Sequence, residues 1–70
     1  MNRVTVTSSN IRSIGYSESE QILEIEFTNS SIYQYPNFPK SVYDDLMAAS
    51  SHGSFFHQNI RYEYAFRRIS

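Results

Sequence analysis

Hydrophobic and polar residues alternate strictly along residues 22–28. Leu23, Ile25 and Phe27 fall on one side of this segment, and two glutamates fall on the other. Successive side chains of a β-strand point to opposite faces of its sheet, so a period of two marks a strand with one buried face. The pattern predicts a strand at Ile22–Thr28 whose leucine, isoleucine and phenylalanine face the core.

Two further segments with the same period flank this strand. Residues 11–17 form one of them, and residues 31–35 form the other, with Tyr33 and Tyr35 on a single face. Asn29-Ser30 separates the second pair of strands, and asparagine tolerates the positive φ of a tight turn. Consecutive strands with short connections predict an antiparallel meander of three strands.

The period changes to that of a helix after the tyrosines. Pro39 stands where a helix commonly opens, and apolar residues then recur at helical spacing over residues 42–47. Gly53 is expected to end this helix or to separate it from a second short helix, for which Ser54 is a suitable N-cap. Residues 62–69 either continue the second helix or run extended along the sheet, and we expect the extended course.

Length and composition allow one small domain. The chain of 70 residues is expected to form a single domain over residues 1–70, and its lack of cysteine excludes disulfides and thiolate metal sites. The expected fold class is α+β, a three-stranded antiparallel β-meander followed by two short helices packed on one face. Six tyrosines and five phenylalanines exceed what one small core readily covers, so we also expect a homo-oligomer.

No segment has the composition of a membrane span or a targeting signal. The chain has no apolar run near the roughly 18 residues of a span. Its first five residues lack the hydrophobic stretch of a signal peptide. We expect a cytoplasmic protein that does not associate with membranes.

Three of the six basic residues form a cluster, although the net charge of the chain is only −1. Arg61, Arg67 and Arg68 lie close together near the C-terminal end, with Glu63 among them. Arginine makes bidentate contacts with phosphate and stacks on aromatic rings, so the cluster is a candidate phosphate or nucleotide site. The alternative is a solvated surface near a chain terminus. A dedicated nucleic-acid binder usually carries a basic excess, which this chain lacks.

Tyr33 and Tyr35 are the candidate stacking residues. Two rings on one face of an exposed sheet can stack bases, each contributing roughly 1–3 kcal/mol. A sheet covered by helices also places aromatic rings in its core, where tyrosine buries its ring and keeps its hydroxyl wet. We favour the core interpretation and keep both tyrosines as candidate ligand contacts.

The residues do not predict an enzyme, a metal site or a cofactor. His52 and His57 are five residues apart and have no cysteine nearby, so they lack a usual zinc spacing. A triad of Ser54, His57 and Asp44 has no nucleophile elbow to support it, and a chain this short leaves little room for a water-excluding pocket. We interpret the histidines as surface or capping residues.

The order of short motifs along the chain resembles that of the KTSC domain family. This small domain is named from the C-terminus of some lysyl-tRNA synthetases and occurs mostly as a free-standing protein of bacteria and phages. The motifs that carry the resemblance are Ser8-Ser9-Asn10-Ile11, Ile14-Gly15-Tyr16, residues 23–27, Tyr33-Gln34-Tyr35, Pro39, Val42-Tyr43, Leu46, Ala49-Ser50-Ser51, Gly53, Phe55-Phe56, Ile60-Arg61 and Tyr64. The pattern covers residues 5–69 and departs from the family at Asn29-Ser30, where glycine is common.

The resemblance implies a nucleic-acid-binding role, RNA in particular, and its motifs include Arg61. We therefore expect a small non-catalytic binding module for RNA, single-stranded nucleic acid or a nucleotide. Its candidate ligand contacts are the two tyrosines and the three arginines named above. The alternative is a protein-interaction module or a homo-oligomer that does not bind nucleic acid, such as a phage-type inhibitor or a protein that sequesters a nucleotide between subunits.

Overall fold

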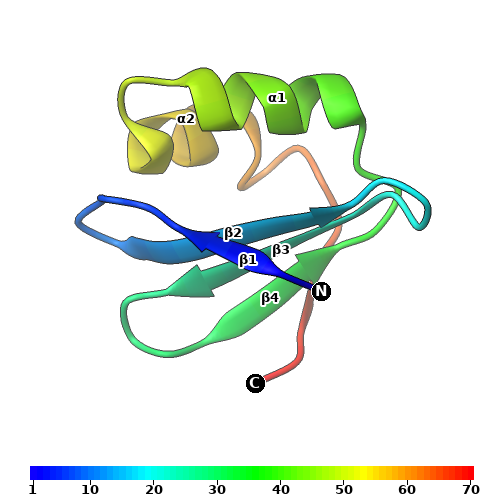
Figure 1. Ribbon diagram of the computed structural model, residues 1–70, viewed down its shortest axis with the longest axis horizontal. Helices are drawn as coiled ribbons and strands as arrows, with labels where there is room; N and C mark the ends of the chain where they lie inside the picture. Colours follow the sequence, from blue (N-terminus) through cyan, green and yellow to red (C-terminus); the bar gives the residue numbers. More distant parts are fainter.

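The computed structural model describes all residues from Met1 to Ser70 and consists of one antiparallel sheet with two helices. The elements, in chain order, are β1 (Arg3–Thr5), β2 (Ile11–Ser17), β3 (Ile22–Phe27), β4 (Ile32–Tyr35), α1 (Lys40–Ala48), α2 (His52–Asn59) and β5 (Arg67–Arg68). The strands follow one another across the sheet in the order β1-β2-β3-β4-β5. Figure 1 shows both helices on one side of this sheet, so the molecule has two layers. Neither helix has the length and apolar character to cross a membrane.

The α+β class and the two helices are confirmed, but the expected number of three strands is wrong. The three predicted strands correspond to β2, β3 and β4. The missed strand β1 has only three residues, too few to show a period, and its pairing of Arg3 with Gly15 is a contact between distant parts of the sequence. The C-terminal segment runs extended, as expected, and forms β5 by pairing Gln34 with Arg67 on the edge of β4.

The core lies between the sheet and the helices. The β3–β4 pairing places Leu23 opposite Tyr35 and Ile25 opposite Tyr33, so both tyrosines share the buried face of the sheet. Tyr35 is 3% exposed and belongs to the core, whereas Tyr33 is partly buried at its margin. The nine core residues are Ile11, Ile14, Leu23, Ile25, Tyr35, Phe38, Leu46, Phe56 and Ile60.

The second helix begins earlier than the sequence indicated. Ser51 is its N-cap, because the Ser51 Oγ accepts a hydrogen bond from the Ser54 backbone N–H at 3.2 Å. The expectation that Ser54 is the cap is therefore wrong, and Gly53 lies inside the first turn instead of between the helices. A Cβ on Gly53 would come within 2.5 Å of the Asn10 Oδ1, so a larger residue here would displace the Asn10 side chain.

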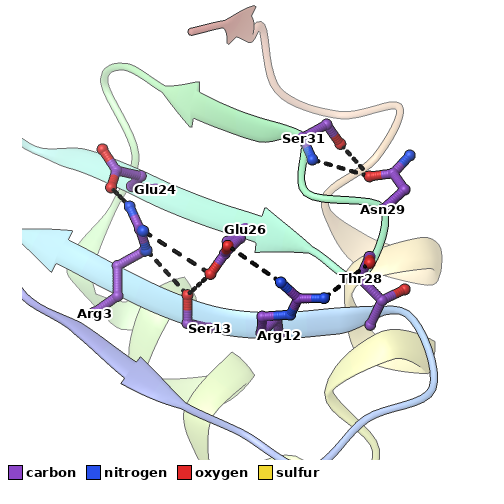
Figure 2. Close-up of polar contacts among 8 residues, drawn as sticks. All are labelled: Arg3, Arg12, Ser13, Glu24, Glu26, Thr28, Asn29 and Ser31. Atoms are coloured by element: carbon purple, nitrogen blue, oxygen red, sulfur yellow. Dashed lines mark hydrogen bonds and ion pairs between the residues drawn. The ribbon is translucent and has the colours of Figure 1, made fainter. Parts of the chain in front are cut away.

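A polar network crosses the face of the sheet that lies away from the helices (Figure 2). Glu24 is expected to face outward and does so, yet it is only 6% exposed. The Arg3 guanidinium donates to one carboxylate oxygen of Glu24, and the Gln34 Nε2 donates to the other at 2.8 Å. The Arg67 Nη2 in turn donates to the Gln34 Oε1 at 2.8 Å. One chain of polar contacts thus connects β1, β3, β4 and β5.

An irregularity in β2 completes this network. The pairing of β2 with β3 shifts at Arg12, so that both Arg12 and Ser13 approach Glu26. The Ser13 Oγ donates to the Glu26 Oε1 at 2.9 Å, and the Arg12 Nη1 lies 3.7 Å from the Glu26 Oε2. The Arg12 Nη2 also donates to the Thr28 carbonyl oxygen at 3.0 Å, as Figure 2 shows. The two outward glutamates are therefore both held by cations.

Truncation of the core should cost much of the stability of so small a domain. Leu23→Ala and Leu46→Ala each remove a fully buried side chain, and we expect each to lower the free energy of unfolding by about 2–5 kcal/mol. Val4→Ala, which truncates an exposed side chain, serves as the control and should unfold at nearly the wild-type denaturant concentration. Wild-type midpoints for both leucine variants would contradict this description of the core.

The Glu24 carboxylate should make stability depend on pH. Burial raises its pKa, but hydrogen bonds from Gln34 and Arg3 and the guanidinium charge outweigh burial, so the pKa lies below its ordinary value of 4.5. A lowered folded pKa gives stability that is fully present above pH 4.5 and is lost as the pH falls through the folded value. We expect Glu24→Gln to lower the free energy of unfolding by about 1–3 kcal/mol at pH 7.

The difference between wild type and Glu24→Gln should shrink as the pH falls below 4.5. Unfolding by denaturant at several pH values measures this difference directly. Glu20→Gln, which changes an exposed carboxylate in the turn before β3, should show a small difference at every pH. A Glu24 difference that stays constant into acid would mean that the carboxylate is not stabilised in its ionised form.

Candidate functional site

A groove of about 460 Å³ lies at one end of the sheet, beside the second half of α2 and the turn that follows it. Its walls come from the loop before β2, from β3 and β4, from α2 and from residues 61–66. Most of the lining residues are aromatic. Polar side chains lie at one end of the groove, and the side chains of His57 and Arg61 lie at its rim. Segments distant in sequence therefore build it together.

The aromatic wall follows from the β3–β4 register. The Tyr33 ring lies 5.6 Å from Phe27 and 5.3 Å from Phe66, measured between ring centroids. The Tyr35 ring lies 5.9 Å from both Phe56 and Phe66. Edge and tilted contacts at these distances are favourable beyond the area they bury. The groove therefore has a continuous wall of aromatic rings in mutual contact.

The two predicted tyrosines have unequal positions in this wall. Tyr35 is buried, and burial raises the pKa of its hydroxyl, with the neighbouring Tyr33 adding to the effect, so the group stays neutral. Tyr33 keeps part of its ring accessible. Phe66 covers the outer side of both rings and is itself 55% exposed. The accessible aromatic surface is thus that of Tyr33 and Phe66, and not a flat pair of tyrosines.

Arg61 stands at the rim of the groove and has no carboxylate partner. It follows Ile60, whose full burial anchors the chain just beyond α2. The Arg61 guanidinium carbon lies 5.2 Å from the centre of the Tyr62 ring, and its Nη1 lies 3.3 Å from the His57 Nδ1. The four ion pairs of the protein involve only Arg3, Arg12 and Lys40 as cations. The positive charge of Arg61 is therefore available to an anionic ligand.

Arg67 and Arg68 lie outside the groove. Arg67 is paired with Gln34 on β5, and its Nε and Nη2 both donate to the Gln34 Oε1, at 3.1 and 2.8 Å. Arg68 is paired with Tyr33 and donates from Nε to the Ser70 carbonyl oxygen at 2.8 Å. Neither has a carboxylate partner. The structure thus brings Arg61 to the groove and leaves the other two predicted arginines on the neighbouring sheet edge.

Polar side chains close one end of the groove. The Asn29 Oδ1 accepts hydrogen bonds from the Ser31 backbone N–H at 3.0 Å and from the Ser31 Oγ at 2.6 Å, which fixes the hairpin turn, where Ser30 takes a φ of 73°. These contacts leave the Asn29 amide nitrogen as a free donor beside the rings. Asn10 lines the groove as well. Its backbone N–H donates to the Ser8 Oγ at 3.4 Å, which closes the turn before β2.

Several lining residues were not predicted from the sequence. They are Asn10, Phe27, Asn29, Ser31, Phe56, His57, Tyr62 and Phe66. The alternation of residues 22–28 places Phe27 on the face shared with the tyrosines, so it was within reach of sequence reasoning. Phe66 and His57 gave no such signal, because their approach to the groove depends on the pairing of the tail with β4 and on the position of α2.

The chemistry of the lining suits an anion that carries a flat ring. No aspartate or glutamate lines the groove. No three metal-ligating side chains of the protein gather in one place. Aromatic rings accept a planar group by stacking, and an arginine without a carboxylate partner binds phosphate or carboxylate through charge-assisted hydrogen bonds.

Comparison with known proteins gives one consistent result. The family model for the KTSC domain matches residues 7–64. A crystal structure of a KTSC domain protein from Yersinia pestis superposes with a TM-score of 0.95 at 38% identity, covering 99% of this chain and 97% of the other. An uncharacterized protein of Stutzerimonas stutzeri is 43% identical over 83% of this chain and 82% of its own length. A lysine–tRNA ligase of Nostoc punctiforme is 37% identical over 86% of this chain, a match that spans 11% of the ligase.

Proposed function

This chain belongs to the KTSC domain family, and we propose that it is a small non-catalytic module that binds a nucleotide of RNA or of another single-stranded nucleic acid. The base would stack on the accessible faces of Tyr33 and Phe66, and Arg61 would contact an adjacent phosphate. Stacking on aromatic rings tolerates any base, because every base has a π face. The module would therefore read the strand's shape and charge more than its sequence.

The single observation that carries this proposal is the composition of the groove. Its lining combines accessible aromatic rings with Arg61, which has no carboxylate partner, and includes no acidic residue. A nucleotide offers the matching pair of groups, a flat ring and an anion separated by a sugar. The net charge of −1 provides no general attraction to nucleic acid, so binding would depend on these local contacts and have modest affinity.

The relatives favour RNA among the single-stranded nucleic acids. Lysine–tRNA ligases of three cyanobacterial strains contain a segment 32–37% identical to this chain. An enzyme of that name acts on a tRNA, so RNA is the first ligand to test.

Arg61→Ala should weaken binding without unfolding the protein. Loss of a charge-assisted contact with phosphate predicts a decrease in binding free energy of about 1.5–3 kcal/mol for a short single-stranded RNA at low salt. The thermal unfolding midpoint should stay near that of wild type, because the Arg61 side chain is exposed. Lys40→Ala is the matched control, since Lys40 is an exposed cation paired with Asp44 and does not line the groove.

Replacing Arg67 and Arg68 together should change the salt dependence more than the preference for bases. Each phosphate contact that is lost should lower the slope of log K against log salt by about 0.7, because fewer counterions are released. Phosphate contacts carry no sequence information, so the ranking of RNA sequences should stay the same. Absence of association with RNA, single-stranded DNA and mononucleotides at low salt would overturn the proposed function.

Self-association is a second candidate function, favoured by the exposed apolar side chains near the end of the chain. Tyr62 is 77% exposed, and Phe66 and Ile69 are each about half exposed. Phe66 and Ile69 flank β5, which is the last strand of the sheet and has no neighbouring strand on its outer side. Exposed aromatic residues of this kind are enriched in protein interfaces.

The protein should form a dimer or a closed assembly at micromolar concentration. Light scattering should give at least twice the mass of the single chain, and Tyr62→Ser should return it to the monomer mass. Val4→Ser, at the opposite edge of the sheet, is the control and should leave the assembly intact. A monomer mass for the wild type at high concentration would rule out this candidate.

A further inference from the structure

His57 occupies the boundary between the groove and a second hollow. The second hollow measures about 290 Å³, and no hydrophobic residue lines it. His57 and Asn10 line both hollows. The imidazole stands in the last turn of α2, four residues before Arg61. Two side chains four residues apart at the end of a helix lie on one side of it, so both nitrogen-rich groups face the same rim.

The contact between these two side chains constrains the imidazole. The Arg61 Nη1 lies 3.3 Å from the His57 Nδ1. A guanidinium only donates hydrogen bonds, so this contact is a hydrogen bond only in the tautomer whose Nδ1 carries no proton. In that tautomer the Nε2–H is the remaining donor of the ring.

Protonation of His57 would break this contact and leave two cations side by side. The charged and titratable groups that line the two hollows with His57 are Arg61, Tyr33, Tyr35 and Tyr62, and no carboxylate is among them. Nothing in either lining neutralises the second positive charge. An anion between the two side chains would do so, because each cation then donates to it.

On the basis of the proposed function, we infer that His57 and Arg61 together form the phosphate site of the groove, and that His57 binds phosphate as an imidazolium. The phosphate of the bound nucleotide replaces the Nδ1 lone pair as the acceptor for Arg61, and His57 becomes a second donor. Binding then takes up a proton. Affinity is highest where histidine is already protonated and falls as the pH rises through the range in which histidine titrates.

The probe for the test is a short single-stranded oligothymidylate without a terminal phosphate. A terminal phosphate monoester loses its second proton near pH 6 and would add a pH dependence of its own, whereas internal diesters keep one charge throughout. The chain has two histidines, so His52→Gln is the matched control. The His52 Nδ1 lies 2.9 Å from the Leu46 carbonyl oxygen at the end of α1, and His52 lines neither hollow.

Affinity is measured by titration at pH 5.5 and pH 8.0 at one ionic strength. We expect wild type and His52→Gln to bind about five- to tenfold more tightly at pH 5.5, the effect of one charge-assisted contact at an exposed site. His57→Gln should bind equally at both pH values, and His57→Lys should bind tightly at both. Calorimetry in two buffers that differ in ionisation enthalpy should show proton uptake by wild type and none by His57→Gln.

The outcomes separate this inference from the function on which it rests. Binding that depends on salt but not on pH, or a pH dependence that persists in His57→Gln, overturns the role of His57 and leaves the binding module intact. Absence of binding at both pH values by this probe, by single-stranded RNA and by mononucleotides overturns the proposed function itself. Melting curves of each variant at both pH values show whether a loss of binding reflects unfolding.

Discussion

The pairing of β3 with β4 in a single register determines both the core and the groove. Leu23 lies opposite Tyr35 and Ile25 opposite Tyr33, so the two tyrosines join the apolar face beneath the helices. A slip of one residue would turn both tyrosines to the outer face and place Gln34 under α2. The rings of Phe27, Phe56 and Phe66 would then lose the partners that align them, and the aromatic wall would not form.

Polar contacts on the outer face of the sheet also stabilise this register. Glu24 is nearly buried and accepts from both Arg3 and Gln34, so a slip would leave a buried carboxylate without partners. Gln34 also accepts from Arg67 on the tail strand, and the neighbouring Phe66 contacts both tyrosine rings on the opposite face. The polar network therefore contributes to the shape of the groove, although none of the residues in the network lines the groove.

Sequence patterns predicted the elements that depend on neighbouring residues, and missed those that depend on contacts between distant segments. Alternation located three strands, because a half-buried strand needs a period of two, but β1 and β5 are too short to show one. Ser51 and Ser54 are equally good caps by type, and the hydrogen bond from the Ser54 backbone N–H to the Ser51 Oγ identifies Ser51 as the cap. At the site, charge clustering indicated Arg61, whereas His57 was interpreted as a surface or capping residue, although it stands one helical turn before Arg61 in the sequence.

The distribution of ion pairs explains how a chain with a net charge of −1 can have an electropositive groove. Glu24, Glu26 and Asp44 are held by cations on the outer face and on α1, away from the groove. The arginines that remain unpaired all lie on the C-terminal segment. The proposed ligand, one nucleotide with its phosphate, would occupy a single groove of this size. Self-association and nucleotide binding would compete for one surface, because Tyr62 and Phe66 both line the groove and are among the exposed apolar residues proposed for the interface.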